Sequence, residues 1–238
     1  MIGEALWEDR HSLERWRAME RSSARTFAAL YQQHPSIEGG NIWHKEWFRH
    51  ITLDRFRAIK PKDIPIHFFL DTAYKEKQKG SDNDPSGIIG ACRIDNYMYI
   101  VDAMSVYKDF PDLIKFLPEY VRGHGYTNKS TLRIEPKANG ISVIQQLRKE
   151  TDLNVTETPT PTDSKETRAN ANSAKIECGR VYLVDGSWND SYIHQVTQFP
   201  AVAHDEYVDV TDYAIDYLIN DEVDIPDDIE QRLGIHYD

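Results

Sequence analysis

Acidic residues stand where predicted strands and helices end, and carboxylates in such places can bind metal. Asp71 follows the most apolar run of the chain, and Glu135 ends a second, shorter run. A further group occupies the first turns of a predicted helix, where residues three or four apart share one face: Asp205, Glu206 and Asp209. If the two strands are neighbours and that helix crosses their ends, the carboxylates converge. A hard divalent cation such as Mg²⁺ or Mn²⁺ would then hold them together.

Each of these residues also has an ordinary structural interpretation. An aspartate at a strand end, such as Asp71, is commonly a turn or cap residue, and Glu135 could be a surface acid. Asp205 could cap the helix that follows it, and His204 is more often a surface residue than a metal ligand. The prediction of a metal site therefore rests on the combination of acids and on their order along the chain.

The apolar pattern predicts an α/β fold with a mixed sheet. The run 64–70 predicts a buried strand, and the runs 88–94 and 97–103, joined by Asp95-Asn96, predict a β-hairpin. The later predicted elements are a helix at 109–124, a strand at 131–135, a helix at 140–150, a strand at 153–157, a helix at 164–174, a strand at 181–184, and helices at 190–199 and 203–219. An antiparallel hairpin thus opens a partly parallel sheet that helices flank.

Charge and composition divide the 238 residues into three parts. The sequence predicts a short, basic, helical N-terminal extension at residues 1–62, the α/β domain at residues 63–220 and an acidic tail at residues 221–238. The net charge is −11, and residues 201–238 alone carry twelve acids against the single base Arg232. The preceding 200 residues are therefore neutral. This argues against a protein that coats nucleic acid by positive charge, but it is compatible with a nuclease built on carboxylates.

Several other classes of protein are excluded or disfavoured. No apolar run approaches the roughly 18 residues of a membrane helix, so we expect no membrane partner. The first ten residues carry no apolar signal segment, and the two cysteines, Cys92 and Cys178, form no CxxC pair. We therefore expect a reducing, cytoplasmic setting. No GxxxxGK[ST] motif occurs, which excludes a P-loop ATPase within this chain.

Five motifs, in their order along the chain, resemble the nuclease half of tailed-bacteriophage terminase large subunits. They are Asp71-Thr-Ala, Glu135-Pro-Lys-Ala-Asn-Gly140, Ser164-Lys-Glu-Thr-Arg168, Gly179-Arg-Val-Tyr182 and His204-Asp-Glu-Tyr-Val-Asp209. The resemblance covers residues 63–220 and implies an RNase H-like fold related to RuvC-type resolvases. The front of the chain also resembles the end of the terminase ATPase half and its linker.

The resemblance implies a role for the acidic residues. Asp71, Glu135 and Asp209 would be the catalytic metal ligands, and Asp205 would be a candidate fourth ligand. Family members commonly carry two adjacent aspartates after the histidine, where this chain has Asp205-Glu206. The third ligand is therefore open between Asp205, Glu206 and Asp209. We favour Asp209, because a small-to-apolar helical run follows it and would hold it rigidly on the sheet.

The implied activity is that of a metal-dependent DNA endonuclease. Two Mg²⁺ or Mn²⁺ ions, about 3.5–4 Å apart, would activate a water and stabilise the leaving 3′ oxygen during phosphodiester hydrolysis. Lys165 and Arg168, one helical turn apart, would contact DNA phosphates, and Lys137 is a further candidate for such a contact. A solvated helix face is the ordinary alternative for Lys165 and Arg168.

The resemblance also implies partners and a location. The substrate would be double-stranded concatemeric DNA, and the partners would be the terminase ATPase domain, the portal and the small terminase subunit. The location would be the cytoplasm of a phage-infected bacterium, and transiently the procapsid portal. Two alternatives stay open: a RuvC-like junction resolvase, and a non-catalytic docking module of the packaging motor whose carboxylates are vestigial.

Overall fold

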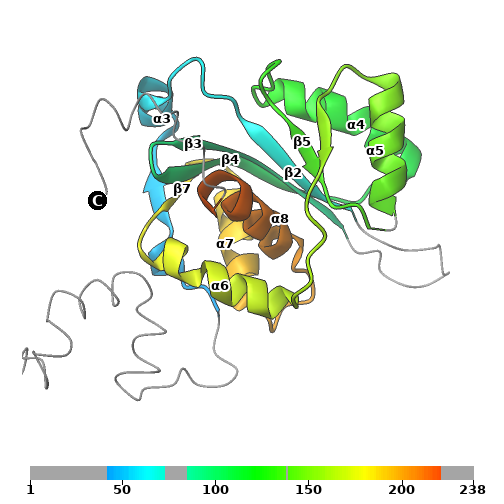
Figure 1. Ribbon diagram of the computed structural model, residues 1–238. Helices are drawn as coiled ribbons and strands as arrows, with labels where there is room; N and C mark the ends of the chain where they lie inside the picture. Colours follow the sequence, from blue (N-terminus) through cyan, green and yellow to red (C-terminus); the bar gives the residue numbers. More distant parts are fainter. Residues whose placement is uncertain (1–41, 73–84, 138, 221–238) are drawn as a thin grey trace, which may run out of the picture.

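The structure is a computed structural model that describes residues 42–72, 85–137 and 139–220 (Figure 1). The acidic tail predicted at 221–238 and most of the extension predicted at 1–62 lie outside the described residues. Within them, a seven-stranded sheet carries helices on both faces. None of the helices described is both long enough and apolar enough to cross a membrane.

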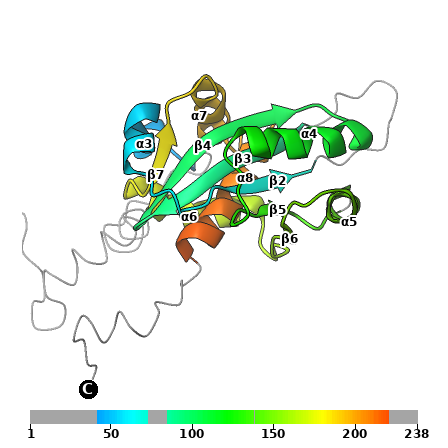
Figure 2. The ribbon, with the colours of Figure 1, turned by 90° about the horizontal axis from the view of Figure 1, so that it is seen from above.

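The sheet has an antiparallel centre and parallel flanks. Its strand order is β1-β7-β4-β3-β2-β5-β6. β3 is antiparallel to both β2 and β4, and all other neighbours are parallel; Figure 2 shows β2, β3 and β4 side by side. The strands are β1 (Arg49–Ile51), β2 (His67–Asp71), β3 (Ser86–Ile94), β4 (Tyr97–Val106), β5 (Leu132–Ile134), β6 (Val155–Glu157) and β7 (Val181–Val184). The predicted mixed sheet is confirmed.

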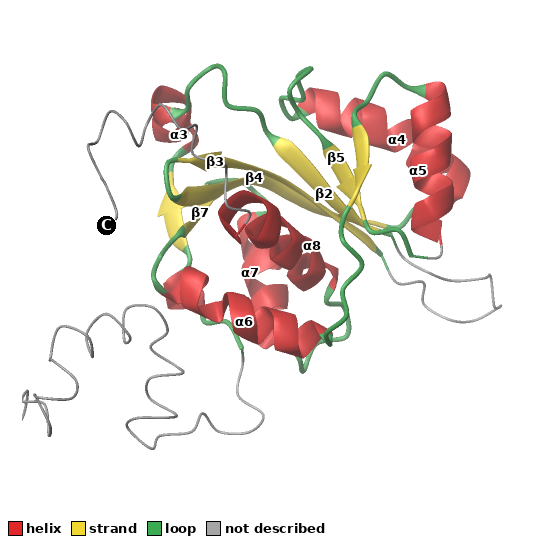
Figure 3. Cartoon of the chain, viewed as in Figure 1, coloured by secondary structure: helices red, strands yellow, loops and turns green. Residues whose placement is uncertain are grey.

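Six α-helices surround this sheet in the described part of the chain (Figure 3). They are α3 (Leu53–Ile59), α4 (Phe110–Gly123), α5 (Asn139–Glu150), α6 (Lys165–Glu177), α7 (Asn189–Gln198) and α8 (Glu206–Ile215), with a 3₁₀ turn η1 (Lys45–Trp47) and a π-helical turn η2 (Asp216–Asn220). Side-chain caps fix where three of them begin: Thr52 accepts from the backbone N–H of Arg55 before α3. Asp109 accepts from the backbone N–H of Asp112 before α4, and Ser164 accepts from that of Thr167 before α6.

The β3–β4 hairpin turns at Asp95-Asn96, as the sequence predicted. Asp95 adopts φ of 51°, a left-handed conformation that aspartate tolerates better than most residues. The two long strands on either side stay in register apart from one irregularity between Gly90 and Ala91. This hairpin forms the centre of the sheet, next to β2.

Two elements differ from the sequence prediction. β1 lies inside the segment predicted as a helical extension, yet it pairs in parallel with β7 at the sheet edge, and Trp43 and Phe48 before it are buried in the core. Three residues are too short to show strand periodicity, so the apolar pattern carried no signal for β1. The last predicted helix, 203–219, is divided into α8 and the π-helical turn η2.

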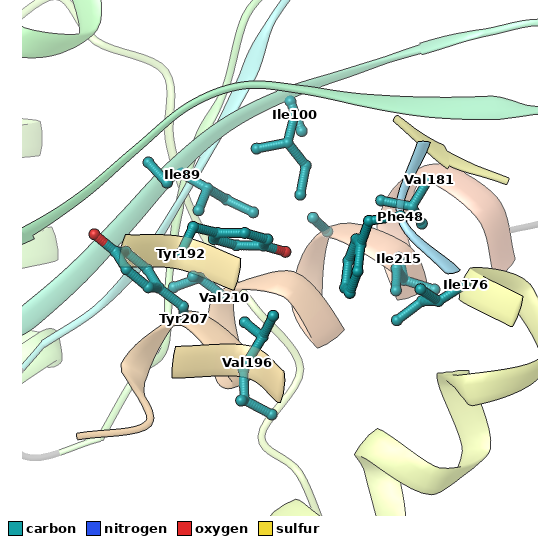
Figure 4. Close-up of a cluster of buried hydrophobic side chains, with 14 of the residues drawn as sticks. Phe48, Ile89, Ile100, Ile176, Val181, Tyr192, Val196, Tyr207, Val210 and Ile215 are labelled. Atoms are coloured by element: carbon teal, nitrogen blue, oxygen red, sulfur yellow. The ribbon is translucent and has the colours of Figure 1, made fainter. Parts of the chain in front are cut away.

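Two apolar cores lie on opposite faces of the sheet. One packs α6, α7 and α8 on the sheet (Figure 4), and the other packs α3, α4 and α5. Alternate residues of β2 serve the two cores: Phe68 and Leu70 face α4 and α5, whereas Phe69 faces α8. Because side chains alternate along a strand, Asp71 is on the α8 face together with Phe69.

A buried acid lies in the middle of α8. Asp212 is fully buried, and its Oδ1 accepts a hydrogen bond from Nδ2 of Asn172 on α6 at 3.0 Å. Burial raises the pKa of Asp212 to about 8; Asn172 and Arg168 oppose this shift, and the charges of Asp216 and Asp209 add to it. The folded chain therefore holds a proton on Asp212 at a pH where the unfolded chain has lost it.

We predict that Asp212→Asn stabilises the protein more at about pH 8 than at about pH 5. Since the folded-state pKa lies above the unfolded value, this group lowers the free energy of unfolding as pH rises between about 4 and 8. Asparagine keeps the bond to Asn172 and has no proton to lose, so its relative gain should exceed about 1 kcal/mol across this range. Urea unfolding of both proteins in EDTA measures it; a difference that does not change with pH would contradict the prediction.

Candidate active site

Asp71 and Glu135 lie at the ends of two neighbouring parallel strands. Asp71 is the last residue of β2 and Glu135 directly follows β5. Leu70 pairs with Ile134, and the backbone N–H of Glu135 donates to the carbonyl oxygen of Leu70 at 3.3 Å. The parallel register thus brings the two acids to one edge of the sheet. Glu135 is 4% exposed and Asp71 is half-buried.

The third acid, Asp209, comes from the first turn of α8 and is buried. α8 packs against β2 and β3, which places its first turn over the end of β2. Both carboxylate oxygens of Asp209 meet cations from α6: Oδ2 pairs with Lys165 and Oδ1 with Arg168. Burial raises the pKa of Asp209 even though both cations act to lower it.

The three acids act on one another electrostatically. Burial, followed by the charges of Asp209 and Glu135, raises the pKa of Asp71 to about 8. Burial and then the charges of Asp209, Glu135 and Asp71 also raise the pKa of Tyr213, one turn further along α8. The structure thus brings together acids from β2, β5 and α8 in one cluster. Their role as metal ligands stays a prediction.

The adjacent acids Asp205 and Glu206 have other partners. Glu206 is buried, and its Oε1 accepts hydrogen bonds from Ser105 on β4 and, at 2.9 Å, from Gln195 on α7. Asp205 occupies the N-cap position of α8, but its side chain caps no backbone N–H. It instead accepts from Nζ of Lys165 at 2.6 Å. Asp205 thus lies at the rim of the site, and Glu206 fastens α8 to its neighbours.

The three basic residues predicted to bind DNA surround the carboxylates. Lys165 bridges Asp205 and Asp209, and its side chain is 26% exposed. Burial lowers the pKa of Lys165, but the charges of Asp209 and Asp205 outweigh this and raise it above its ordinary value. Arg168 is more buried, and Lys137, which is exposed, pairs with Glu135 at 2.6 Å. All three cations offset the charge of the acids.

The donor set fits a hard divalent cation. Carboxylate oxygens are the ligands that Mg²⁺ and Mn²⁺ prefer, and the mutual repulsion of Asp71, Glu135 and Asp209 is what such an ion would offset. Within residues 42–72, 85–137 and 139–220, however, no three acidic, histidine or cysteine side chains are already arranged as a metal site. Both carboxylate oxygens of Asp209 are paired with Lys165 and Arg168 in this arrangement.

Two residues beside the cluster were not identified from the sequence. Arg133 lies two residues before Glu135 on β5, and Tyr213 lies four residues after Asp209 on α8. Residues two apart in an extended strand share a face, so Arg133 is on the same face as Glu135. Residues four apart in a helix also share a face, so Tyr213 is on the same face as Asp209. These spacings were the available signal, but they indicate a site only once the acids are known to converge.

A close turn holds Glu135 in place. Gly140, in the first turn of α5, lies so near that a Cβ there would be 2.0 Å from the carbonyl oxygen of Glu135. The backbone N–H of Gly140 donates to the carbonyl oxygen of Lys137 at 2.7 Å, which closes the turn. Only glycine therefore fits at this position without displacing the backbone of Glu135.

The chain matches a known protein family. The family model described as the terminase RNaseH-like domain matches residues 72–218, more than half of the chain. No relative is found among curated proteins by sequence comparison.

Two solved structures share the fold. The large terminase of a thermophilic bacteriophage, in complex with ADP, is 10% identical with a TM-score of 0.57; the match covers 87% of this chain and 52% of that one. The Mn-soaked, inhibitor-bound terminase nuclease domain of human cytomegalovirus is 11% identical with a TM-score of 0.51, covering 75% and 96%. At these identities the likeness concerns the fold alone, and it confirms the predicted RNase H-like class.

We predict that Gly140→Ala destabilises the protein by about 1–3 kcal/mol, because the added Cβ must push away the backbone that carries Glu135. Gly123, near the end of α4, is the matched control, since a Cβ there meets no atom within 4 Å. Gly123→Ala should be neutral or stabilise by up to about 1 kcal/mol. Chemical denaturation of the three proteins decides it, and equal stabilities of the two variants would refute the close-turn argument.

Proposed function

Because this chain belongs to the terminase RNaseH-like domain family, we propose that it is a divalent-metal-dependent endonuclease that cleaves double-stranded DNA during genome packaging. The observation that carries the proposal is the cluster of Asp71, Glu135 and Asp209. Acids from β2, β5 and α8 meet there, and burial, followed by the charges of Asp209 and Glu135, raises the pKa of Asp71 to about 8. Acids that repel one another in this way are typical of sites where a divalent cation offsets their charge.

Asp71, Glu135 and Asp209 would hold two cations, Mg²⁺ or Mn²⁺, with Asp205 as a fourth ligand at the rim. Asp209 is preferred over Glu206 as the third ligand, since the charge of Asp209 acts on Asp71, whereas Glu206 is bound to Ser105 and Gln195. When bound, the cations would supply an activated water and charge stabilisation for the leaving oxygen.

The basic residues act in two ways in this proposal. Without metal, Lys165 and Arg168 neutralise Asp209 and limit the repulsion among the acids. With metal and substrate, the same side chains and Lys137 lie at the edge of the site, where a DNA phosphate would approach. Because these side chains are buried or already paired with acids, they orient the DNA backbone only near the site. Tight binding of long DNA needs positive charges on other parts of the protein.

Packaging requires more than cleavage. The match to the bacteriophage large terminase covers 52% of that chain, whose structure also contains ADP. We propose that the nuclease acts together with a terminase ATPase domain, a portal and a small terminase subunit, in the cytoplasm of an infected bacterium.

We predict that Asp71→Ala abolishes cleavage of plasmid DNA while the fold stays intact. Loss of one ligand of a metal pair should lower the rate at least about 100-fold. Asp54→Ala is the matched control, because Asp54 is a nearly fully exposed acid on α3. Nicking and linearisation are measured with Mg²⁺, Mn²⁺ or EDTA. If Asp71→Ala cut as fast as Asp54→Ala, the assignment of Asp71 would be wrong.

A second prediction concerns metal binding itself. Mn²⁺ should raise the melting temperature of the wild type, because it binds the folded chain and relieves repulsion among the acids. EDTA should reverse the rise, and Asp209→Asn should remove most of it. Differential scanning fluorimetry measures the shift. A non-catalytic docking module with vestigial acids predicts the same melting temperature with and without Mn²⁺.

A further inference from the structure

A pocket of about 130 Å³ lies beside the acidic cluster, on the side of β5, α6 and α8. We call it the Arg133 pocket. The side chains that matter to its chemistry are those of Arg133, Thr158, Pro159, Arg168, Tyr213 and Tyr217. Arg133 precedes Glu135 by two residues and Tyr213 follows Asp209 by one helical turn, so the pocket adjoins the site without including its three acids. Its volume is that of several water molecules, enough for a phosphate group.

Hydrogen-bond donors without partners gather around this pocket. Among the described residues, Nε of Arg133, Oγ1 of Thr158, Nε of Arg168 and the hydroxyl of Tyr213 are all buried and have no hydrogen-bond partner. Thr158 is only 3% exposed. Buried polar groups are rarely left without a partner, and each one that is calls for an explanation. All four groups can donate a hydrogen bond, so an acceptor, and an anion above all, fits them.

The charge of the pocket also favours an anion. Arg133 and Arg168 contribute two positive charges, and Asp216 is the only acid among the described residues that line the pocket. The carboxylate of Asp216 accepts from Nδ2 of Asn172 at 3.2 Å, and Arg168 already pairs with Asp209. Arg133 is different: no carboxylate of the described residues forms an ion pair with it.

The position of Arg133 is fixed without an ion pair. Its guanidinium lies 3.9 Å from the ring centroid of Tyr217, and within the described residues its Nη2 donates to the carbonyl oxygen of Glu157, at 3.5 Å. Stacking on an aromatic ring orients the guanidinium plane and leaves its donors for another group. A guanidinium held in this way is suited to bidentate contact with a phosphate.

We propose that the Arg133 pocket binds a backbone phosphate of the DNA strand next to the phosphate that is cleaved. Arg133 is then a positioning residue, and Thr158 and Tyr213 supply additional donors. This inference rests on the proposed nuclease function, which it deepens by naming a second point at which the substrate is held. The strand is then fixed at two phosphates, one at the acidic cluster and its neighbour in the pocket.

The test separates the pocket from the chemistry by measuring binding without metal. The full chain in EDTA is compared with Arg133→Gln, Thr158→Val and the control Arg122→Gln, at constant ionic strength. Arg122 is an exposed arginine on α4 and lines no part of the pocket. Thr158→Val keeps the shape and the backbone bond from Thr158 to the carbonyl oxygen of Ile134. It removes only an unpartnered hydroxyl, so the fold should not be weakened.

Two probes are used, inorganic phosphate in a melting experiment and a short DNA duplex in fluorescence anisotropy. Phosphate should raise the melting temperatures of the wild type and of Arg122→Gln by the same amount. It should raise that of Thr158→Val by less, and it should not raise that of Arg133→Gln. Arg133→Gln should weaken duplex binding about ten-fold, the usual cost of losing a hydrogen-bonded charge. With Mn²⁺ present, its KM for DNA should rise by about the same factor while kcat is retained.

Several results would overturn the proposal. An equal phosphate effect in wild type and Arg133→Gln would show that the pocket is no phosphate site. Equal losses of duplex affinity in Arg133→Gln and Arg122→Gln would show a general charge effect only. Phosphate binding that depends on Arg133, with unchanged duplex affinity, would assign the pocket to free phosphate instead of DNA. If the chain binds phosphate and duplex in EDTA as expected but never cuts DNA, the proposed nuclease function is contradicted and the phosphate site in the pocket is still supported.

Discussion

The close packing of α8 on the sheet is the constraint on which the candidate site depends. Gly87 of β3 pairs with Asp71, and a Cβ at Gly87 would lie 2.6 Å from the side chain of Glu206 in α8. The helix can approach the strand ends this closely only because the strand carries glycine there. Glu206 is then fixed by Ser105 and Gln195, so the first turn of α8, with Asp209, has a defined position over Asp71.

This packing brings acids together, and nearby cations offset their repulsion only in part. Burying acids that face one another disfavours their charged forms, which is why the pKa of Asp71 is raised to about 8. Lys165 and Arg168 pair directly with Asp209, whereas the lysines that act on Asp71 are too weak to prevent this rise. The result is a site whose stability and chemistry oppose each other, a relation that is common where function needs charges a stable fold would avoid. Asp212, three residues further along α8, adds a second buried acid to the same helix.

Much of this arrangement could be predicted from the sequence, because the signals were local. The β2 strand, the Asp95-Asn96 hairpin and the amphipathic α4 all follow from periodicity and turn chemistry. The acids Asp71, Glu135 and Asp209 stood out because each lies at the end of such an element. The order of motifs along the chain then singled out the family.

What could not be predicted depends on contacts between distant segments. β1 has three residues and no pattern of its own, and it is a strand only because β7 offers an edge. The hydrogen bond between Arg168 and Asp209 joins α6 to α8 across 41 positions of the sequence. Arg133 stacks on Tyr217 and lines a pocket together with Thr158, and both residues are distant from it in the sequence. Sequence spacing defines which face a residue is on, but it does not show which partner that face meets.

The distribution of the three acids along the chain has a consequence for biosynthesis. Asp71, Glu135 and Asp209 come from β2, from the end of β5 and from α8, so each is made at a different stage of translation. A chain still emerging from the ribosome has the first two acids but lacks the helix that supplies the third. Any truncated product that ends before α8 lacks both the third acid and the packing that buries the others. The candidate site is therefore complete only after nearly the whole domain has been synthesised and folded.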